Sequence, residues 1–146
     1  MTRRLKISTH GSRLQILLNQ ANRKATAELR RTVSTQRLPV EFWRMLEVLA
    51  DERGRSVSEL AHLAGMQMSA TSKLVDRMAE AALLQRSADP ADQRRVILHI
   101  SDFGLQKVSA LKGEVRRHRD RICESFGPER QAQLTELLQD FILAHR

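Results

Sequence analysis

Two adjoining stretches, residues 56–65 and 66–78, constrain the fold of this chain more than any other feature. In the first stretch, Ser56 and Glu59 have the spacing of a capping box, which predicts a helix that starts at the serine. Gly65 follows, and glycine readily adopts the left-handed conformation that ends a helix. Two short helices joined by such a bend predict a helix-turn-helix.

The second stretch is amphipathic when it is drawn as a helix with about 3.6 residues per turn. Its apolar face carries Thr71, Leu74, Val75, Met78 and Ala82. Its opposite face carries Ser69, Ser72, Lys73, Asp76, Arg77 and Glu80. Small hydroxyl groups and cations can enter a DNA groove without colliding with the base edges. We therefore expect one face to pack into a core and the other to contact DNA.

The charge balance is consistent with a nucleic-acid partner. The chain has 25 Lys and Arg against 17 Asp and Glu, a formal net charge of +8. Such an excess favours a polyanion, either nucleic acid or an anionic membrane surface, and simple solubility is the ordinary alternative. No apolar run approaches the roughly 20 residues that cross a bilayer. Because we find no signal peptide and a single cysteine, we expect a cytoplasmic protein without an intramolecular disulfide.

A β-hairpin is predicted after the second stretch, from residues 84–87 and 95–100. In its second strand, the residues expected to face inward are Val96, Leu98 and Ile100. The connecting loop ends in Arg94 and Arg95. A hairpin placed after a helix-turn-helix is a wing, and its tip can project a guanidinium toward the negative potential of a narrow minor groove. We expect Asp92 to pair with Arg94 and hold it extended; an exposed loop with incidental charges is the alternative.

Apolar residues at helical spacing predict four further helices, so the expected fold is mostly α with a small β wing. These helices start near Ser12, Pro39, Ser101 and Pro128. The second contains Trp43, the only tryptophan, which we expect to pack in the core. The third includes the basic run 116–121, which is typical of a solvated face.

The first and last of these helices carry apolar stripes that the rest of the chain is too small to cover. The stripes include Leu14 near the start and Leu134, Leu138 and Phe141 near the end. A winged helix of about 60 residues cannot bury both stripes, whereas a symmetric homodimer can. We therefore expect residues 1–38 and 101–146 to form a helical dimerisation region, and residues 39–100 to form a winged helix-turn-helix DNA-binding lobe.

Several short motifs between Trp43 and Ser101 resemble the MarR family of winged helix-turn-helix transcription regulators. They are Ser58-Glu59-Leu60-Ala61, Leu74-Val75-Asp76-Arg77-Met78, Leu83-Leu84-Gln85-Arg86, Asp89-Pro90-Ala91-Asp92-Gln93-Arg94-Arg95 and Ser101-Asp102-Phe103-Gly104. The resemblance implies a homodimer with intertwined terminal helices, a recognition helix in the major groove and a wing arginine in the minor groove. The expected DNA-binding residues are Ser69, Ser72, Lys73, Arg77, Arg94 and Arg95, with Asp92 as a support.

The same resemblance implies a ligand, because members of the family often bind small aromatic or phenolic acids and then release DNA. The cleft lies between the dimer helices and the DNA-binding lobe, and here it would be lined by His10, Arg13 and Trp43. The chain departs from the family pattern at the start of the recognition helix, with Gln67-Met68, so we expect its base preference to differ there. It also departs at Ala82, where a glycine is usual.

The sequence favours a sequence-specific regulator, a homodimeric repressor that a small aromatic or phenolic ligand releases from a palindromic operator. The alternative is an architectural or non-specific DNA-binding protein without a ligand. An enzyme is not expected, because the sequence has no nucleophile elbow, phosphate loop or suggestive pair of carboxylates. The five histidines and Cys123 show no paired ligand spacing, so neither a metal nor another cofactor is expected. We expect Cys123 to be a buried structural thiol.

Overall fold

The computed structural model of the protein describes residues 13–145. Within that range the chain forms six helices and a two-stranded antiparallel sheet. In chain order the elements are α1 (Leu14–Ser34), α2 (Val40–Leu49), α3 (Val57–Ala64), α4 (Met68–Glu80), β1 (Leu84–Ala88), β2 (Val96–Ile100), α5 (Asp102–Phe126) and α6 (Pro128–Ala144). The predicted fold, mostly α with a small β wing, is confirmed. In the described part of the chain, no helix is long and apolar enough to cross a bilayer.

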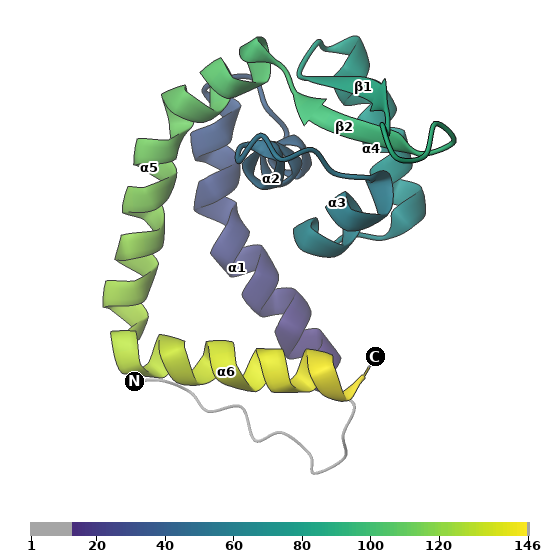
Figure 1. The fold of residues 1–146 in the computed structure, drawn as a ribbon. Coiled ribbons are helices and arrows are strands. Elements are labelled where there is room, and N and C mark those ends of the chain that lie inside the picture. Colours follow the sequence, from purple (N-terminus) through teal and green to yellow (C-terminus); the bar gives the residue numbers. More distant parts are fainter. Residues whose placement is uncertain (1–12, 146) are drawn as a thin grey trace.

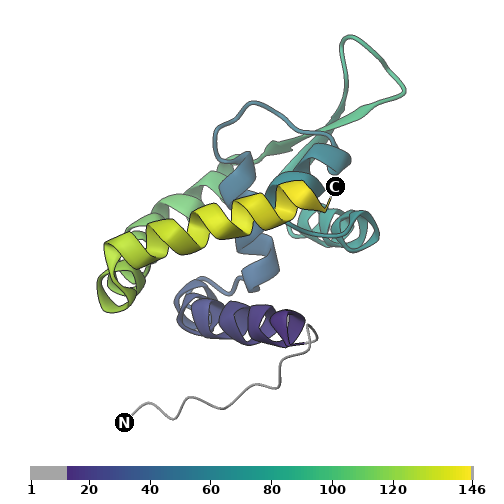
Figure 2. The same ribbon diagram turned by 90° about the horizontal axis from the view of Figure 1, so that it is seen from below.

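The elements form a lobe and an open helical frame (Figure 1). Helices α2, α3 and α4 pack with the hairpin at one end of α5, and they make up the lobe. The frame consists of α1, which packs along α5, and of α6, which runs from the far end of α5 toward the start of α1. Figure 2 shows the hairpin loop extending away from all of the helices. The lobe therefore exposes both the helix-turn-helix and the wing.

The core of the protein is centred on α2. Its fully buried residues include Trp43, Met45, Leu46 and Leu49, each 2 % exposed or less. The same apolar cluster continues into Val33 of α1 and into Leu111 and Val115 of α5. Trp43 therefore packs in the core, as the sequence predicted, and the core joins the lobe to the nearer part of the frame.

The helix-turn-helix forms as the sequence predicted. Ser56 Oγ accepts a hydrogen bond from the backbone N–H of Glu59 at 3.2 Å, so the serine caps α3. Gly65 has a φ of 66° and ends that helix in the left-handed conformation. The buried residues of α4 are Thr71, Val75 and Met78. The hydroxyl of Thr71 donates to the carbonyl oxygen of Gln67 at 2.8 Å, so this buried hydroxyl has a hydrogen-bond partner.

Several sequence expectations were wrong in detail. Ala82 does not continue the apolar face of α4, because the helix ends two residues earlier and Ala82 is exposed. Val96 is 45 % exposed rather than inward, because it pairs with Ala88 at the end of the sheet nearest the wing tip. Cys123 is half-buried rather than fully buried. Ser12, the expected cap of the first helix, lies outside the described residues.

Ala82 occupies the left-handed region with a φ of 59°. That conformation costs an L-residue roughly 1–2 kcal/mol, and glycine avoids this cost but loses about 0.5–1 kcal/mol more backbone entropy on folding. We expect Ala82→Gly to raise the free energy of unfolding by up to about 1 kcal/mol. Urea denaturation followed by circular dichroism checks this. Ala79→Gly, inside α4, is the control and should lower stability by about 1 kcal/mol; a similar loss in Ala82→Gly would contradict the prediction.

Candidate nucleic-acid interface

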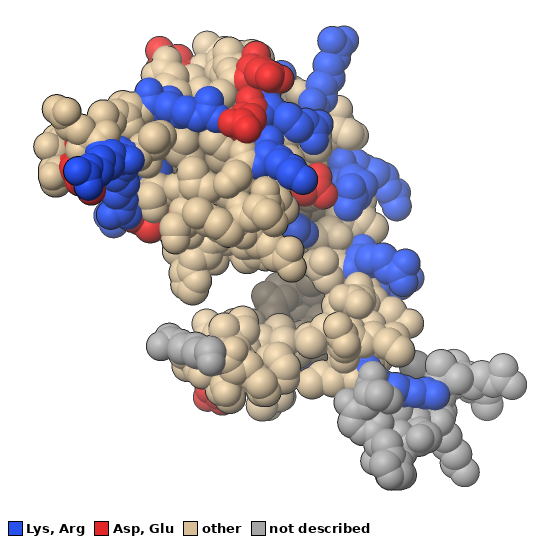
Figure 3. Space-filling view, turned by 90° about the vertical axis from the view of Figure 1, so that its right-hand side faces the viewer, with Lys and Arg blue, Asp and Glu red and all other residues tan. Residues whose placement is uncertain are grey.

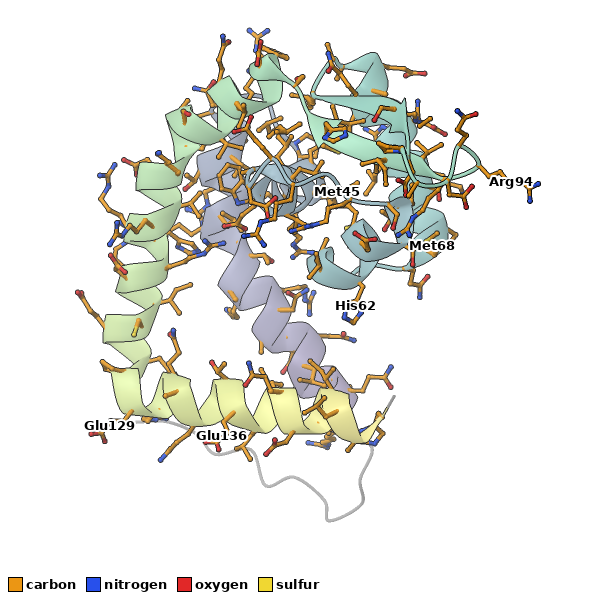
Figure 4. All side chains as sticks on the ribbon, in the orientation of Figure 1. Met45, His62, Met68, Arg94, Glu129 and Glu136 are labelled. Atoms are coloured by element: carbon orange, nitrogen blue, oxygen red, sulfur yellow. The ribbon has the colours of Figure 1, made fainter. Side chains whose placement is uncertain are left out.

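The outward face of α4 presents polar residues that the sequence assigned to DNA. Ser69, Ser72 and Lys73 are all exposed along the first half of the helix. Met68, the first residue of α4, is 52 % exposed, so an apolar side chain stands beside the hydroxyl groups (Figure 4). The N-terminal residues of a recognition helix contact base edges in the major groove. Contact between this end of α4 and base edges therefore stays a prediction.

Arg77 and Asp76, further along α4, are held by contacts within the lobe. The guanidinium of Arg77 lies 5.2 Å from the centre of the Phe42 ring of α2, a cation–π contact that orients it. Asp76 forms an ion pair with Arg86 of β1. No local pattern predicts a role for Arg86, because its partner lies ten residues away on another element. The pair ties α4 to the start of the wing.

The wing tip is shaped by hydrogen bonds between carboxylates and the backbone. Asp92 accepts a hydrogen bond from the backbone N–H of Arg94 at 3.0 Å, and Asp89 accepts one from the N–H of Ala91 at 2.9 Å. Asp92 thus supports Arg94 through its backbone, whereas we had expected a pairing between the two side chains. The Arg94 side chain points away from the tip (Figure 4). A shaped loop with a projecting guanidinium suits a narrow minor groove.

Arg95 points back toward the lobe and forms an ion pair with Glu59 of α3. Beside it, Arg55 and Leu98 exchange two backbone hydrogen bonds of 3.0 and 2.7 Å, so the segment before α3 joins the sheet. These contacts fasten the wing to the helix-turn-helix. The capping-box spacing correctly placed the backbone of Glu59, but nothing local predicts that its carboxylate holds an arginine 36 residues later.

Charged side chains of both signs lie on the face of the molecule that is drawn in Figure 3. Figure 3 shows Lys and Arg, with several Asp and Glu among them, over the upper part of this face and mostly uncharged residues below them. With a formal net charge of +8, the protein as a whole attracts polyanions. The excess lies outside the lobe, because residues 39–100 carry 8 Lys and Arg against 9 Asp and Glu, whereas residues 1–38 carry 9 against 1.

An apolar groove lies between α1 and α6, away from the wing. It is lined by Leu14, Leu17, Leu18, Ala21, Leu134, Leu137, Leu138 and Phe141. Leu14 is 48 % exposed and Leu137 is 66 % exposed. Contiguous exposed apolar surface marks an interaction site. The structure therefore brings together all four residues that the sequence assigned to dimerisation, and their contact with a second copy remains a prediction.

Of the three residues expected to line a ligand cleft, the two that the structure describes, Arg13 and Trp43, do not share one surface. Trp43 is only 2 % exposed, and among the described residues its indole N–H has no hydrogen-bond partner. Arg13 is exposed at the N-terminal cap of α1. His10 lies outside the described residues. Their assignment to a ligand cleft stays a prediction.

The basic run 116–121 is not simply a solvated face, as we had expected. Arg119 pairs with Glu47 of α2 at 2.5 Å, and Arg121 pairs with Glu28 of α1. His118 is 3 % exposed, with Nδ1 3.0 Å from Oε2 of Glu28 and Nε2 3.2 Å from a backbone carbonyl oxygen of α1. The run therefore joins α5 to α1 and α2. Its partners come from distant parts of the sequence, so no local pattern indicates them.

Hydrogen bonds from Arg121, and next from His118, lower the pKa of Glu28 below its ordinary value. The stability from these contacts is therefore fully present above the ordinary pKa of a glutamate, about 4.3, and is lost as the pH falls through the lowered pKa. We expect Glu28→Gln to unfold at a lower urea concentration than the wild type at pH 7, with the difference shrinking below about pH 4. Urea midpoints measured from pH 7 to pH 3 check this.

The matched control for that prediction is Glu114→Gln, which removes an exposed ion pair with Arg117 inside α5. An exposed pair of this kind contributes little, so its midpoint should stay close to that of the wild type. A stability difference for Glu28→Gln that is the same at every pH would show that packing, not charge, explains it.

The lobe combines a helix-turn-helix, an outward polar face on its second helix and a wing that ends in an arginine. These features define a winged helix-turn-helix DNA-binding protein. The model of the MarR family matches residues 38–95, which is the lobe without its last strand, β2. The lobe is therefore similar to that of MarR-family transcriptional regulators, as the motif resemblance indicated.

Relatives extend this similarity over nearly the whole chain. The homoprotocatechuate degradative operon repressor of Escherichia coli is 26 % identical over 129 residues, which cover 88 % of this chain and 87 % of the relative. The crystal structure of transcriptional regulator PA4135 has a TM-score of 0.80 and 28 % identity, covering 90 % of this chain and 96 % of the other. That of NadR in complex with 4-hydroxyphenylacetate has a TM-score of 0.77 and 26 % identity, covering 94 % and 96 %.

Proposed function

We propose that this protein is a homodimeric repressor that binds a palindromic operator and is released from it by a small aromatic or phenolic acid. In each protomer α4 enters the major groove, where Ser69, Ser72, Lys73 and Arg77 contact bases and phosphates. Arg94 enters the adjacent minor groove. Asp92 and Arg95 position the wing through the backbone of Arg94 and through Glu59. The observation that carries the proposal is that one lobe presents both the polar face of α4 and a projecting wing arginine.

The groove between α1 and α6 supports the dimeric part of the proposal. Residues 1–38 and 101–146 form the dimerisation region, residues 39–100 form the DNA-binding lobe, and a second copy covers the apolar groove. Two lobes related by a twofold axis read half-sites one helical turn apart, about 34–36 Å. A twofold-symmetric protein requires a palindromic site, so the same geometry predicts the symmetry of the operator.

Two relatives support the class of effector. One represses a homoprotocatechuate degradative operon, and NadR was crystallised with 4-hydroxyphenylacetate. We place the effector of this protein between the frame and the lobe, against His10, Arg13 and Trp43. Trp43 must become accessible when the ligand binds, and its indole N–H, which has no partner among the described residues, is then free to donate.

DNase footprinting of the promoter beside the protein's own gene tests this function. We expect a symmetric protected region that weakens steeply with salt, because phosphate contacts release counterions. Addition of 4-hydroxyphenylacetate or a related phenolic acid is expected to remove the protection. Competition by bulk genomic DNA at equal affinity would instead favour the architectural, non-specific alternative. A footprint that no phenolic acid changes would overturn the effector and leave the repressor.

A further inference from the structure

A depression lies where the end of α1, the start of α2, the end of α4 and the start of α5 meet. It has a volume of about 290 Å³. Its apolar lining residues include Leu38, Phe42, Leu83 and Phe103, and its basic lining residues are Arg37 and Lys107. Phe103 is 44 % exposed in the first turn of α5, whereas Phe42 is 6 % exposed. One ring is thus a buried wall, and the other is open to a ligand.

The polar groups of this depression complement an anion. Lys107 Nζ donates to the backbone carbonyl oxygen of Gln36 at 3.0 Å and lies 5.1 Å from the centre of the Phe103 ring. An ammonium group carries three N–H donors, so two remain for a ligand. Among the described residues that line the depression, none is acidic. Two cations beside aromatic and aliphatic walls suit an organic anion with an apolar body.

The backbone of Arg37 adds a second observation. Arg37 has a φ of 57° just after α1, a left-handed position that glycine or asparagine usually occupies. An L-residue there costs of the order of 1 kcal/mol, so glycine would fit this backbone better than arginine does. Strained residues of this kind cluster at ligand sites. The chain therefore has an arginine in the lining of the depression in spite of the backbone geometry.

We propose that this depression binds a small planar organic anion, such as an aromatic carboxylate, with its ring against Phe42 and Phe103 and its carboxylate on Arg37 and Lys107. The site is separate from the cleft assigned above to His10, Arg13 and Trp43. Any effect of this anion on repression rests on the proposed function. The anion would touch Leu83, just after α4, and Phe42, whose ring also contacts Arg77.

Calorimetric titration with 2-naphthoate tests the site, and its neutral amide, 2-naphthamide, is the matched probe. The wild type is expected to bind the anion at least about 10-fold more tightly than the amide, because charge-assisted hydrogen bonds are lost with the amide. Lys107→Met and Arg37→Gly are each expected to weaken binding of the anion by about 10-fold. Lys112→Met removes an exposed lysine of α5 outside the depression and should leave binding unchanged.

The results of these titrations test the depression separately from the proposed function. If Arg13→Met weakens binding of 2-naphthoate while Lys107→Met does not, the anion occupies the other cleft and the present proposal is wrong. Equal binding of the anion and the amide, or no binding of either, also overturns it. Operator binding without any ligand tests the proposed function independently. Lys107→Met should retain the wild-type operator affinity, because Lys107 is not one of the proposed DNA contacts.

Discussion

Leu138→Glu is expected to convert the protein to a monomer and to weaken operator binding by roughly 10²–10⁴-fold. Leu138 lies in α6 and lines the apolar groove together with Leu14 and Phe141. A carboxylate in that interface would lose its hydration without gaining a partner, so the second copy cannot dock. A monomer holds one half-site alone and loses the effective concentration that couples the two lobes. Analytical ultracentrifugation and fluorescence anisotropy with operator DNA measure the two effects.

Gln139→Glu is the matched control, because it adds the same carboxylate to the next residue of α6, which faces away from the groove. It should remain dimeric and bind the operator as the wild type does. Leu138 is outside the buried core cluster, so the monomer should retain its helical circular dichroism spectrum. A dimeric Leu138→Glu would show that the groove is not the interface. A monomer with unchanged affinity would show that one lobe suffices for binding.

The parts of the fold that the sequence predicted are those governed by local geometry. Ser56 and Ser101 accept hydrogen bonds from backbone N–H groups three residues later, as their spacing indicated. Gly65 adopts the predicted left-handed bend, and the period of α4 correctly separated its buried face from its exposed one. In each case the interaction is completed within one or two turns of chain. The order of helices, hairpin and helices then follows from these local signals.

The contacts that orient the site join residues far apart in the sequence, and these were missed. Glu59 holds Arg95, and Arg119 reaches Glu47 of α2. Neither pair has a sequence spacing that would distinguish its two residues from charged residues that contact only water. Asp92 was correctly predicted to contact Arg94, but it accepts from the backbone N–H of Arg94 and not from the guanidinium. A carboxylate two residues before an N–H group in a turn can bond the backbone as readily as a side chain. Sequence thus located the candidate contacts, and tertiary structure showed what fixes their positions.

Arg94→Ala is expected to weaken operator binding by about 1–3 kcal/mol for each protomer, and by twice that in the dimer. The guanidinium projects from the wing tip, and Asp92 and Asp89 shape the turn that carries it. Its binding geometry is therefore partly organised before DNA arrives, and less conformational entropy is lost on contact. Fluorescence anisotropy over a series of salt concentrations measures the loss. Arg117→Ala, on α5 and paired with Glu114, is the matched control and should bind as the wild type does.

Arg94→Lys distinguishes a minor-groove contact from a phosphate contact. Lysine keeps the charge but is more strongly hydrated and lacks the planar fork of arginine, so it enters a narrow groove less favourably. If Arg94 lies in the minor groove, Arg94→Lys should recover only part of the affinity lost in Arg94→Ala. Replacing A·T pairs by G·C pairs beneath the wing should then weaken the wild type more than it weakens Arg94→Ala. Full recovery by lysine, with no such dependence on base composition, would place Arg94 on the phosphate backbone and leave sequence reading to α4 alone.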